Sequence, residues 1–342
     1  MTEQLPGATA ANRTVTDHPG AWFSVAFHDQ VRAWVDERLE SRGIRLTGEW
    51  SQPHARPWSS AIRLGSTAGP VWFKVNGAGT RHEPALLRLL ADRVPALVPE
   101  VLAVSTDQGW SLTRDAGPML REALSPSESW RAWESVVREY ATAQLELADA
   151  RDAVLGAGVA EVSPATLPLL ARQLVAELGE LPVDVGGLTF EHTRGLTAML
   201  ARLDVWCAEL DASPVPDSLQ HDDLHSGNIC WSGPAAATVI DWGDASWGSP
   251  LATMLCTLAS MARAADVSTD SAPVLRVRDA YLEAFTTLAT RAELVHLVDL
   301  AVRAGCVTRA LSWRAAMRDV PASGHEEWEF PVRSWLLDLL SR

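Results

Sequence analysis

The first part of the chain shows one helical hydrophobic pattern followed by several strand-like patterns. Residues 20–42 carry apolar side chains at helical spacing and end before Gly43, which predicts one amphipathic helix. Short apolar runs follow, separated by turn residues at 51–53 and 65–70. These runs predict three strands, at residues 44–50, 58–64 and 71–75.

The segment that follows completes an N-terminal unit. Pro84 suits the first turn of a helix, so a helix is predicted for residues 84–93. Two more short strands are predicted, at residues 101–104 and 109–113. A turn with the sequence DAGP comes next, and both composition and charge change there. The sequence therefore predicts a first domain over residues 1–117 and a second over residues 118–342.

Helical periodicity dominates the second domain. The predicted helices lie at residues 127–150, 165–179, 190–211, 250–265, 273–289, 291–317 and 330–341. A non-helical segment, residues 219–247, interrupts them and contains two strand-like fragments, at 228–231 and 238–240. Polar loops held by a rigid scaffold commonly carry function, so this segment is where we expect functional residues.

The basic residues are distributed very unevenly between the two types. Of the 29 basic residues, 28 are arginines and one is a lysine, Lys74. Lys74 has no glycine-rich segment before it, which excludes a P-loop. A lysine-rich nucleic-acid surface cannot exist, and the net charge of −14 argues further against a polyanionic partner. We therefore expect no nucleic-acid partner.

The negative charge lies entirely in the second domain. Residues 1–117 carry 12 basic and 12 acidic side chains, whereas residues 118–342 carry 17 basic and 31 acidic ones. An acidic domain attracts a cationic small molecule, although a solvated acidic surface gives the same composition.

The apolar segments and the cysteines indicate a cytoplasmic protein. Residues 1–17 are polar and lack the apolar core of a signal peptide, and the longest uncharged apolar stretch, at 249–262, is too short to cross a bilayer. The four cysteines lie far apart without a C-x-x-C pair, which favours reduced core thiols over disulfides or zinc ligands. We expect a cytoplasmic location and no membrane partner.

The 219–247 segment carries the pattern of a phosphoryl-transfer site. Asp223 and Asn228 have the spacing H-x-D-x-x-x-x-N, in which the aspartate orients the substrate hydroxyl and the asparagine oxygen binds Mg²⁺. Asp241 begins a D-x-G element after a short apolar strand, as expected for the second metal-binding carboxylate. Asparagine and aspartate oxygens suit Mg²⁺ bound together with nucleotide phosphates.

The only lysine fits the same chemistry. Lys74 lies on a predicted strand between apolar neighbours, where an unpaired ammonium would be costly, and Glu83 stands at the start of the next helix. A lysine held by a glutamate can position the nucleotide phosphates. Each pattern alone occurs by chance, but their order and spacing together are specific.

These motifs resemble the aminoglycoside phosphotransferase and choline kinase-like family. The resemblance rests on residues 221–228, HDDLHSGN, and on residues 240–242, IDW. It implies a bilobal α+β, protein-kinase-like fold, in which a small mixed N-lobe with an antiparallel sheet lies over a larger, mainly helical C-lobe. It also implies ATP or GTP with Mg²⁺ in the cleft, and a hinge at residues 111–117. In the hinge, Ser111, Leu112 and Thr113 would bind the nucleotide through the backbone.

Several other residues are candidates for the substrate site. Asp222 stands where the family usually has glycine and adds a carboxylate beside Asp223. The remaining substrate candidates are Asp244, Glu326, Glu327 and Trp328, of which the last three would bind an amino-sugar cation. His221 is interpreted as a structural brace of the loop rather than a reacting group.

The sequence leaves several alternatives open. The favoured interpretation is a kinase for a small, hydroxylated, cationic molecule such as an aminoglycoside or amino sugar. One alternative is a non-catalytic, nucleotide-binding kinase-like regulator. Another is a metal-dependent hydrolase that uses His221, Asp222 and His225. The choice between ATP and GTP, the substrate hydroxyl, and a monomer or homodimer also stay open.

Overall fold

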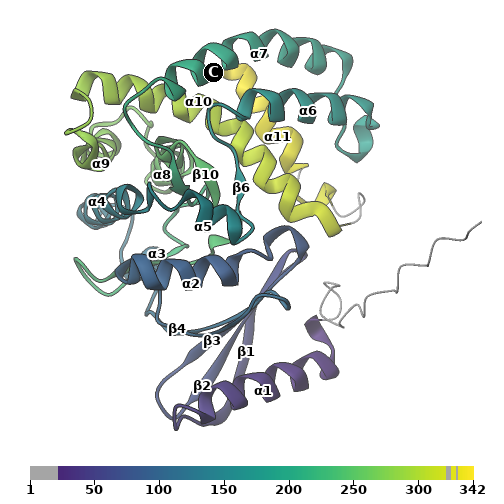
Figure 1. Cartoon of the computed structure of the whole chain (residues 1–342), viewed down its shortest axis with the longest axis vertical. Helices are drawn as coiled ribbons and strands as arrows, with labels where there is room; N and C mark the ends of the chain where they lie inside the picture. The colour runs from purple at the N-terminus through teal and green to yellow at the C-terminus, as the bar shows by residue number, and fades with distance from the viewer. Residues whose placement is uncertain (1–21, 321–324, 329) are drawn as a thin grey trace, which may run out of the picture.

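The chain forms two lobes, and helix α2 (Glu83–Arg93) lies between the sheet of one lobe and the helices of the other (Figure 1). The computed structural model describes residues 22–320, 325–328 and 330–342. Strands and one covering helix form the N-lobe, whereas the C-lobe is mainly helical, which confirms the α+β fold class. Within these residues no helix is long and apolar enough to span a membrane.

The N-lobe is built on a five-stranded antiparallel sheet with strand order β1-β2-β3-β5-β4. The strands are β1 (Leu46–Arg56), β2 (Ser59–Ser66), β3 (Val71–Asn76), β4 (Val101–Ser105) and β5 (Trp110–Arg114). The turn predicted at residues 51–53 is wrong, because β1 continues through it and turns only after Arg56. Pro53 is tolerated there because β1 is an edge strand with a bulge between Ser51 and His54.

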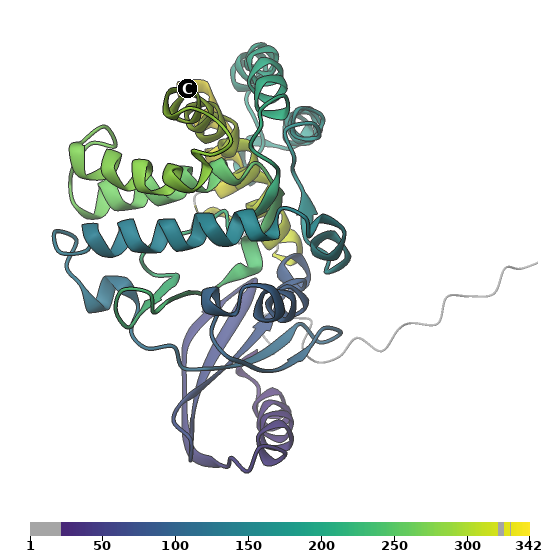
Figure 2. The same ribbon diagram turned by 60° about the vertical axis from the view of Figure 1, so that its left-hand side comes forward.

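Helix α1 (Val25–Glu40) covers the outer face of this sheet (Figure 2). Ser24 caps the helix by accepting the amide of Phe27 at 3.1 Å. The rings of Phe27 and Trp34 pack edge-on against Phe73 and Trp110, with centroids 5.6–6.3 Å apart. This aromatic cluster fixes β3 against α1, and β3 carries Lys74.

Helix α2 (Glu83–Arg93) belongs to the chain of the N-lobe but packs with the core of the C-lobe. Its Leu86, Leu87 and Leu90 are buried in the same hydrophobic cluster as the C-lobe helices. Glu83 begins this helix and is only 1% exposed. The start of α2 is therefore held by both lobes.

The C-lobe contains nine helices among the described residues. They are α3 (Leu120–Ala123), α4 (Trp130–Leu147), α5 (Arg151–Gly156), α6 (Leu167–Glu180), α7 (Phe190–Asp211), α8 (Met254–Ala264), α9 (Ala272–Leu282), α10 (Arg291–Ala316) and α11 (Pro331–Asp338). The predicted fragments near 228–231 and 238–240 form a hairpin of β8 (Ile229–Trp231) and β9 (Ala237–Val239). A further small sheet of β6 (Ala160–Glu161), β10 (Ser246–Gly248) and β7 (Ser218–Gln220) was not predicted, because such short strands show no periodicity.

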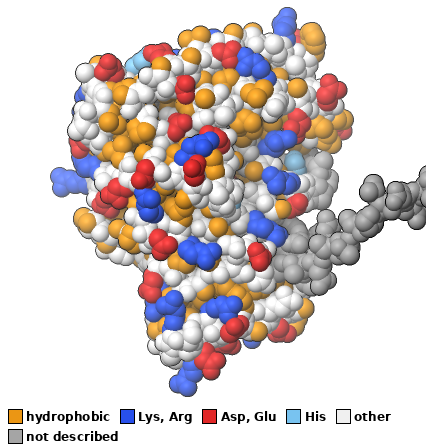
Figure 3. Space-filling model, in the orientation of Figure 1, with side chains coloured by type: hydrophobic (Ala, Val, Ile, Leu, Met, Phe, Trp, Pro, Cys, Tyr) orange, Lys and Arg blue, Asp and Glu red, His pale blue; other side chains and the backbone are white. Residues whose placement is uncertain are grey.

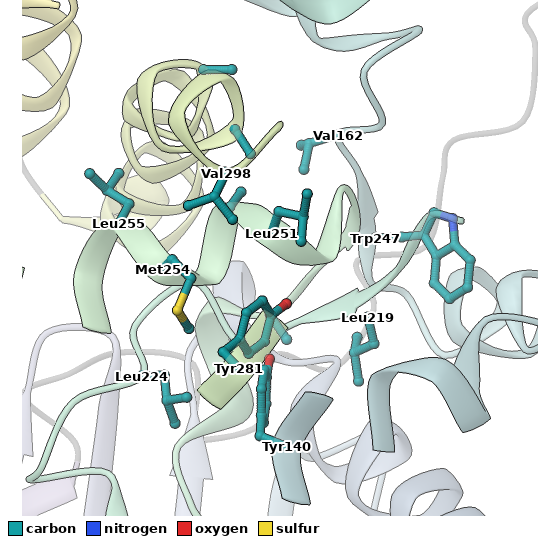
Figure 4. Close-up of a cluster of buried hydrophobic side chains, with 14 of the residues drawn as sticks. Tyr140, Val162, Leu219, Leu224, Trp247, Leu251, Met254, Leu255, Tyr281 and Val298 are labelled. Atoms are coloured by element: carbon teal, nitrogen blue, oxygen red, sulfur yellow. The ribbon is translucent and has the colours of Figure 1, made fainter. Parts of the chain in front are cut away.

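A polar network inside the C-lobe core supports the 219–247 segment. Figure 4 shows Tyr140 and Tyr281 among the surrounding aliphatic side chains. The hydroxyl of Tyr281 donates to Oε1 of Gln144 at 2.7 Å, and Nε2 of Gln144 donates to the carbonyl of Leu219 at 3.0 Å. The amide of His221 donates to the Tyr140 hydroxyl at 2.8 Å. Buried polar groups that are fully paired in this way specify one arrangement of the segment they hold.

The two lobes also touch through the short 3-10 helix η3 (Ala78–Thr80), which lies against the end of α10. A Cβ atom at Gly79 would lie 1.7 Å from the carbonyl oxygen of Ala315. Only glycine permits this approach of two backbones.

We expect Gly79→Ala to destabilise the protein by about 1–3 kcal/mol, as overpacking does in other cores. Gly156→Ala is the control, because nothing lies within 4 Å of a Cβ at Gly156. Thermal unfolding of both variants tests the contact. An equal effect of the two substitutions would show that η3 and α10 move apart at little cost.

Candidate active site

A cavity of about 850 Å³ lies between the two lobes. Its walls come from β1, β2 and β3, from the segment after β5, from the loop at 223–228, from residues 240–244 and from the end of α10. The structure thus brings the predicted site residues Lys74, Glu83, Asp223, Asn228 and Asp241 to one cleft.

Lys74 is the centre of the charged groups in this cleft. Its Nζ lies 2.5 Å from Oε2 of Glu83 and 2.5 Å from Oδ1 of Asp241. Burial disfavours the charged ammonium, but the two carboxylates more than offset this effect and raise the pKa of Lys74. Lys74 is therefore a fixed positive charge at any physiological pH.

The backbone around Asp241 is shaped to hold its carboxylate at the cleft. Asp241 has φ +65°, a left-handed conformation that aspartate tolerates better than most residues. Oε1 of Glu83 accepts the amide of the following Trp242 at 2.9 Å, so Glu83 holds both Lys74 and this turn. Burial opposes ionisation of Asp241, but Lys74 prevails and lowers the Asp241 pKa to about 2.

The third position of the D-x-G element leaves little room for a side chain. A Cβ atom at Gly243 would lie 3.1 Å from Cβ of Thr80, which is a tight contact, and 3.4 Å from Oε2 of Glu83, which is an ordinary van der Waals contact. A side chain at Gly243 would therefore be crowded by Thr80.

The loop that carries Asp223 is braced from behind by His221. This ring is fully buried; its Nε2–H donates to the carbonyl of Ile240 at 2.8 Å, and its Nδ1 accepts the amide of Asp223 at 3.3 Å. Burial lowers the His221 pKa to about 4, so the ring is neutral. These bonds agree with the predicted structural role. They also leave neither ring nitrogen free for a metal, which removes the predicted hydrolase arrangement.

The oxygen atoms at this site fit Mg²⁺. Nδ2 of Asn228 donates to the carbonyl of Asp223 at 3.0 Å, which leaves its Oδ1 without a hydrogen bond from any described residue. Oδ2 of Asp241 is likewise outside the contact with Lys74, and 46% of this side chain is exposed. An amide oxygen and a carboxylate oxygen are hard ligands of the kind Mg²⁺ prefers.

The hinge prediction needs a correction. Ser111, Leu112 and Thr113 lie inside β5, between β3 and β4, so their backbones face the sheet on both sides. Leu112 is fully buried in the N-lobe core, whereas Ser111 and Thr113 line the cavity. The strand continues to Arg114, and the irregular backbone that a base could contact begins only after it.

The substrate prediction for Asp222 is also corrected by its position. Asp222 is 4% exposed and does not line the cavity; its Oδ2 accepts the hydroxyl of Ser246 at 2.5 Å. The backbone of Asp222 has φ +62°, a left-handed conformation that favours glycine and that aspartate also tolerates, so aspartate can stand where the family usually has glycine. Asp222 therefore supports the loop from within the C-lobe.

The other substrate candidates divide into two groups. Asp244 lines the cavity and is 24% exposed. Trp328 instead packs edge-on against Trp58 at 4.9 Å, and neither Trp328 nor the exposed Glu327 lines the cavity. The side chain of Glu326 lies outside the described residues. Glu327 and Trp328, two of the three residues predicted to bind a cation, are thus not part of the cavity wall.

Three residues at the cleft that the sequence did not predict are notable. Trp58 at the β1–β2 turn and Trp313 on α10 line the cavity, and Arg309 on α10 contacts Asp223 and Asp244. Arg309 and Trp313 are four residues apart and share a helix face, but nothing in the sequence distinguishes this face from the rest of a buried helix.

The fold and this arrangement of one lysine, two carboxylates and an asparagine define a kinase-like phosphotransferase. The sequence agrees: the phosphotransferase enzyme family matches residues 52–294, and the chain belongs to this family. The protein is a small-molecule kinase that acts on a hydroxyl group.

Solved structures show the same fold at low sequence identity. The macrolide 2′-phosphotransferase MphH from Brachybacterium faecium is 18% identical, with a TM-score of 0.56 over 89% of this chain and 97% of that one. A choline/ethanolamine kinase family protein from Mesorhizobium loti is 16% identical, with a TM-score of 0.57 over 92% and 98%. Choline kinase LicA from Streptococcus pneumoniae is 13% identical, with a TM-score of 0.58 over 91% and 99%. No curated protein sequence matched.

The buried Asp222 gives a test of the loop that depends on pH. Burial raises its pKa to about 7, from about 4 in an unfolded chain. Between these values the folded state holds the proton and the unfolded state does not, so Asp222 makes stability fall as pH rises.

Asp222→Asn removes the titratable carboxyl group and keeps a residue that tolerates positive φ. We expect the melting temperature of the variant, relative to wild type, to rise between pH 5 and pH 8. Asp152→Asn, at a side chain 98% exposed, is the control. If the difference between Asp222→Asn and wild type is the same at both pH values, Asp222 does not titrate as its burial indicates.

Proposed function

We propose that the protein transfers the γ-phosphoryl group of ATP or GTP, with Mg²⁺, to a hydroxyl of a small molecule. The observation that carries this proposal is the convergence of two sets on one cleft. Lys74, Glu83 and Asp241 form one set, and Asp223 and Asn228 form the other. The sequence predicted both sets, and all five residues line the same cavity.

Each residue has a role that follows from its position. Lys74 neutralises charge on the phosphates, and Glu83 keeps its ammonium in place. Asn228 and Asp241 would hold Mg²⁺, which would neutralise the phosphates and keep them in line. Asp223 orients the acceptor hydroxyl and accepts its proton. The hydroxyl oxygen forms the new bond to phosphorus, while the bond to the β-phosphate oxygen breaks.

The base of the nucleotide would lie against residues 115–118. The side chain of Asp115 accepts the amide of Gly117 at 2.9 Å, which shapes this turn. Ala116 lines the cavity, and its amide has no hydrogen-bond partner among the described residues. This replaces the backbone of residues 111–113 as the proposed base contact. Competition between ATP and GTP for binding distinguishes the two nucleotides.

The acceptor is proposed to be a small, cationic, hydroxylated molecule, with an aminoglycoside or amino sugar as the first candidate. Support comes from the 31 acidic residues beyond residue 117. Figure 3 shows acidic and basic side chains interspersed on one face, so that face carries no large patch of a single charge. A thermal-shift screen of aminoglycosides, macrolides, amino sugars and amino alcohols, with Mg²⁺ and a non-hydrolysable nucleotide, tests this class.

The setting of the reaction is part of the proposal. The four cysteines are buried and free, as expected for a reducing, cytoplasmic compartment. We propose a monomer or homodimer without nucleic-acid or membrane partners.

We expect Asp223→Asn to lower kcat by about 10² to 10⁴-fold, because the amide cannot accept the hydroxyl proton. KM for the nucleotide should stay within about 3-fold of wild type, since Asp223 contacts the acceptor. Asp270→Asn, an exposed substitution outside the cavity, is the control.

Steady-state kinetics with an acceptor from the screen provides the measurement. Wild-type kcat in Asp223→Asn would overturn the assigned role. Nucleotide binding without any phosphorylated product across the panel would favour the non-catalytic regulator instead.

A further inference from the structure

Arg309 is an unusual arginine for its burial. It lies on α10 and is 4% exposed, and no other arginine among the described residues is buried. A buried guanidinium loses its hydration, so it persists only where charged partners compensate it. Its partners therefore indicate why it is there.

Those partners are two carboxylates at the cleft. Nη1 of Arg309 lies 3.0 Å from Oδ2 of Asp244, and Nη2 lies 3.4 Å from Oδ1 of Asp223. The guanidinium also lies 5.9 Å from the ring centroid of Trp313 and 5.7 Å from that of Trp335, within the range of a cation–π contact. The two arms of one rigid fork thus reach two different aspartates.

The contact leaves one oxygen of Asp223 for the acceptor. Nδ1 of His225 accepts the amide of Gly227 at 2.9 Å, so its Nε2 carries the proton and lies 3.6 Å from Oδ2 of Asp223. That distance is too long for a hydrogen bond. Arg309 therefore contacts Oδ1 of Asp223, while Oδ2 has no hydrogen bond from the described residues, and the Asp223 residue lines the cavity.

We propose that Arg309 is a positioning residue for the phosphoryl transfer: it fixes the Asp223 carboxylate through Oδ1 and presents Oδ2 to the acceptor hydroxyl. Without Arg309, repulsion between Asp223 and Asp244 would turn the carboxylate away from the acceptor. The protein itself supplies the positive charge that compensates Asp223, so the acceptor need not bring a cation to this point. This inference rests on the proposed function of Asp223.

Three variants test the proposal. Arg309→Met removes the charge and the fork, and Arg309→Lys keeps the charge but has a single ammonium that cannot reach both aspartates in the same geometry. Arg314→Met is the matched control on the same helix, because Arg314 is exposed and its ion pair is with Glu177, outside the cavity wall. The measurements are kcat and KM for Mg·ATP with an acceptor from the thermal-shift panel, the melting temperature, and a crystal structure of Arg309→Lys.

We expect Arg309→Met to lower kcat by about 10- to 100-fold, because a misplaced reacting group costs this much. KM for Mg·ATP should change by less than about 3-fold, because Arg309 is not among the residues that line the cavity. Arg309→Lys should restore part of kcat, and its crystal structure should show a turned Asp223 carboxylate. Arg314→Met should match wild type.

The outcomes are separable. Wild-type kcat in a folded Arg309→Met, or equal losses of kcat and of nucleotide affinity, would overturn the positioning role. If Arg309→Met does not fold, wild-type kcat in Arg309→Lys overturns it instead. If wild type itself transfers no phosphoryl group, the proposed function fails; an unchanged Asp223 orientation in the Arg309→Lys structure would then overturn the positioning role separately.

Discussion

One ammonium group joins three separate parts of the molecule. Lys74 comes from a central strand of the N-lobe sheet, Glu83 from the helix between the lobes, and Asp241 from a turn of the C-lobe. A buried charge is unstable without partners, so the three elements have to meet where they do. The remaining features of the cleft are arranged around this point.

The C-lobe is built to keep its side of that meeting point fixed. Glu83 also accepts the amide of Trp242, and the adjacent Gly243 packs closely against Thr80. His221 joins the Asp223 loop to the strand before Asp241 through the carbonyl of Ile240. Hydrogen bonds therefore join the loop that carries Asp223 to the turn that carries Asp241. Arg309 in turn contacts the Asp223 carboxylate from α10.

Much of this cleft was predictable because its signals are local. Asp223 and Asn228 are five residues apart in one loop, and Asp241 follows a short strand, so their spacing reflects the geometry of a single hairpin. Lys74 was predicted because it is the only lysine of the chain and lies between buried neighbours. The fold class followed from the change from strand to helical periodicity near residue 117.

The features that were not predicted depend on contacts distant in sequence. Arg309 is 65 residues beyond Asp244, and its helix shows only an ordinary buried face. Ser111, Leu112 and Thr113 were predicted as hinge residues because the apolar pattern of β5 does not show where the strand stops pairing. The acidic run at 326–328 was predicted from composition alone, and composition does not show whether a loop lies at the cavity or elsewhere on the surface.

Nucleotide affinity of Lys74→Arg tests the central claim most directly, because the substitution keeps the charge and changes only its shape. A planar guanidinium cannot replace a compact ammonium that lies 2.5 Å from each of two carboxylates. We expect a folded variant whose dissociation constant for Mg·ATP, measured by calorimetry, rises by about 10-fold or more. Wild-type affinity in the folded variant would contradict it, and Lys74 would then be one more basic residue rather than the point on which the cleft depends.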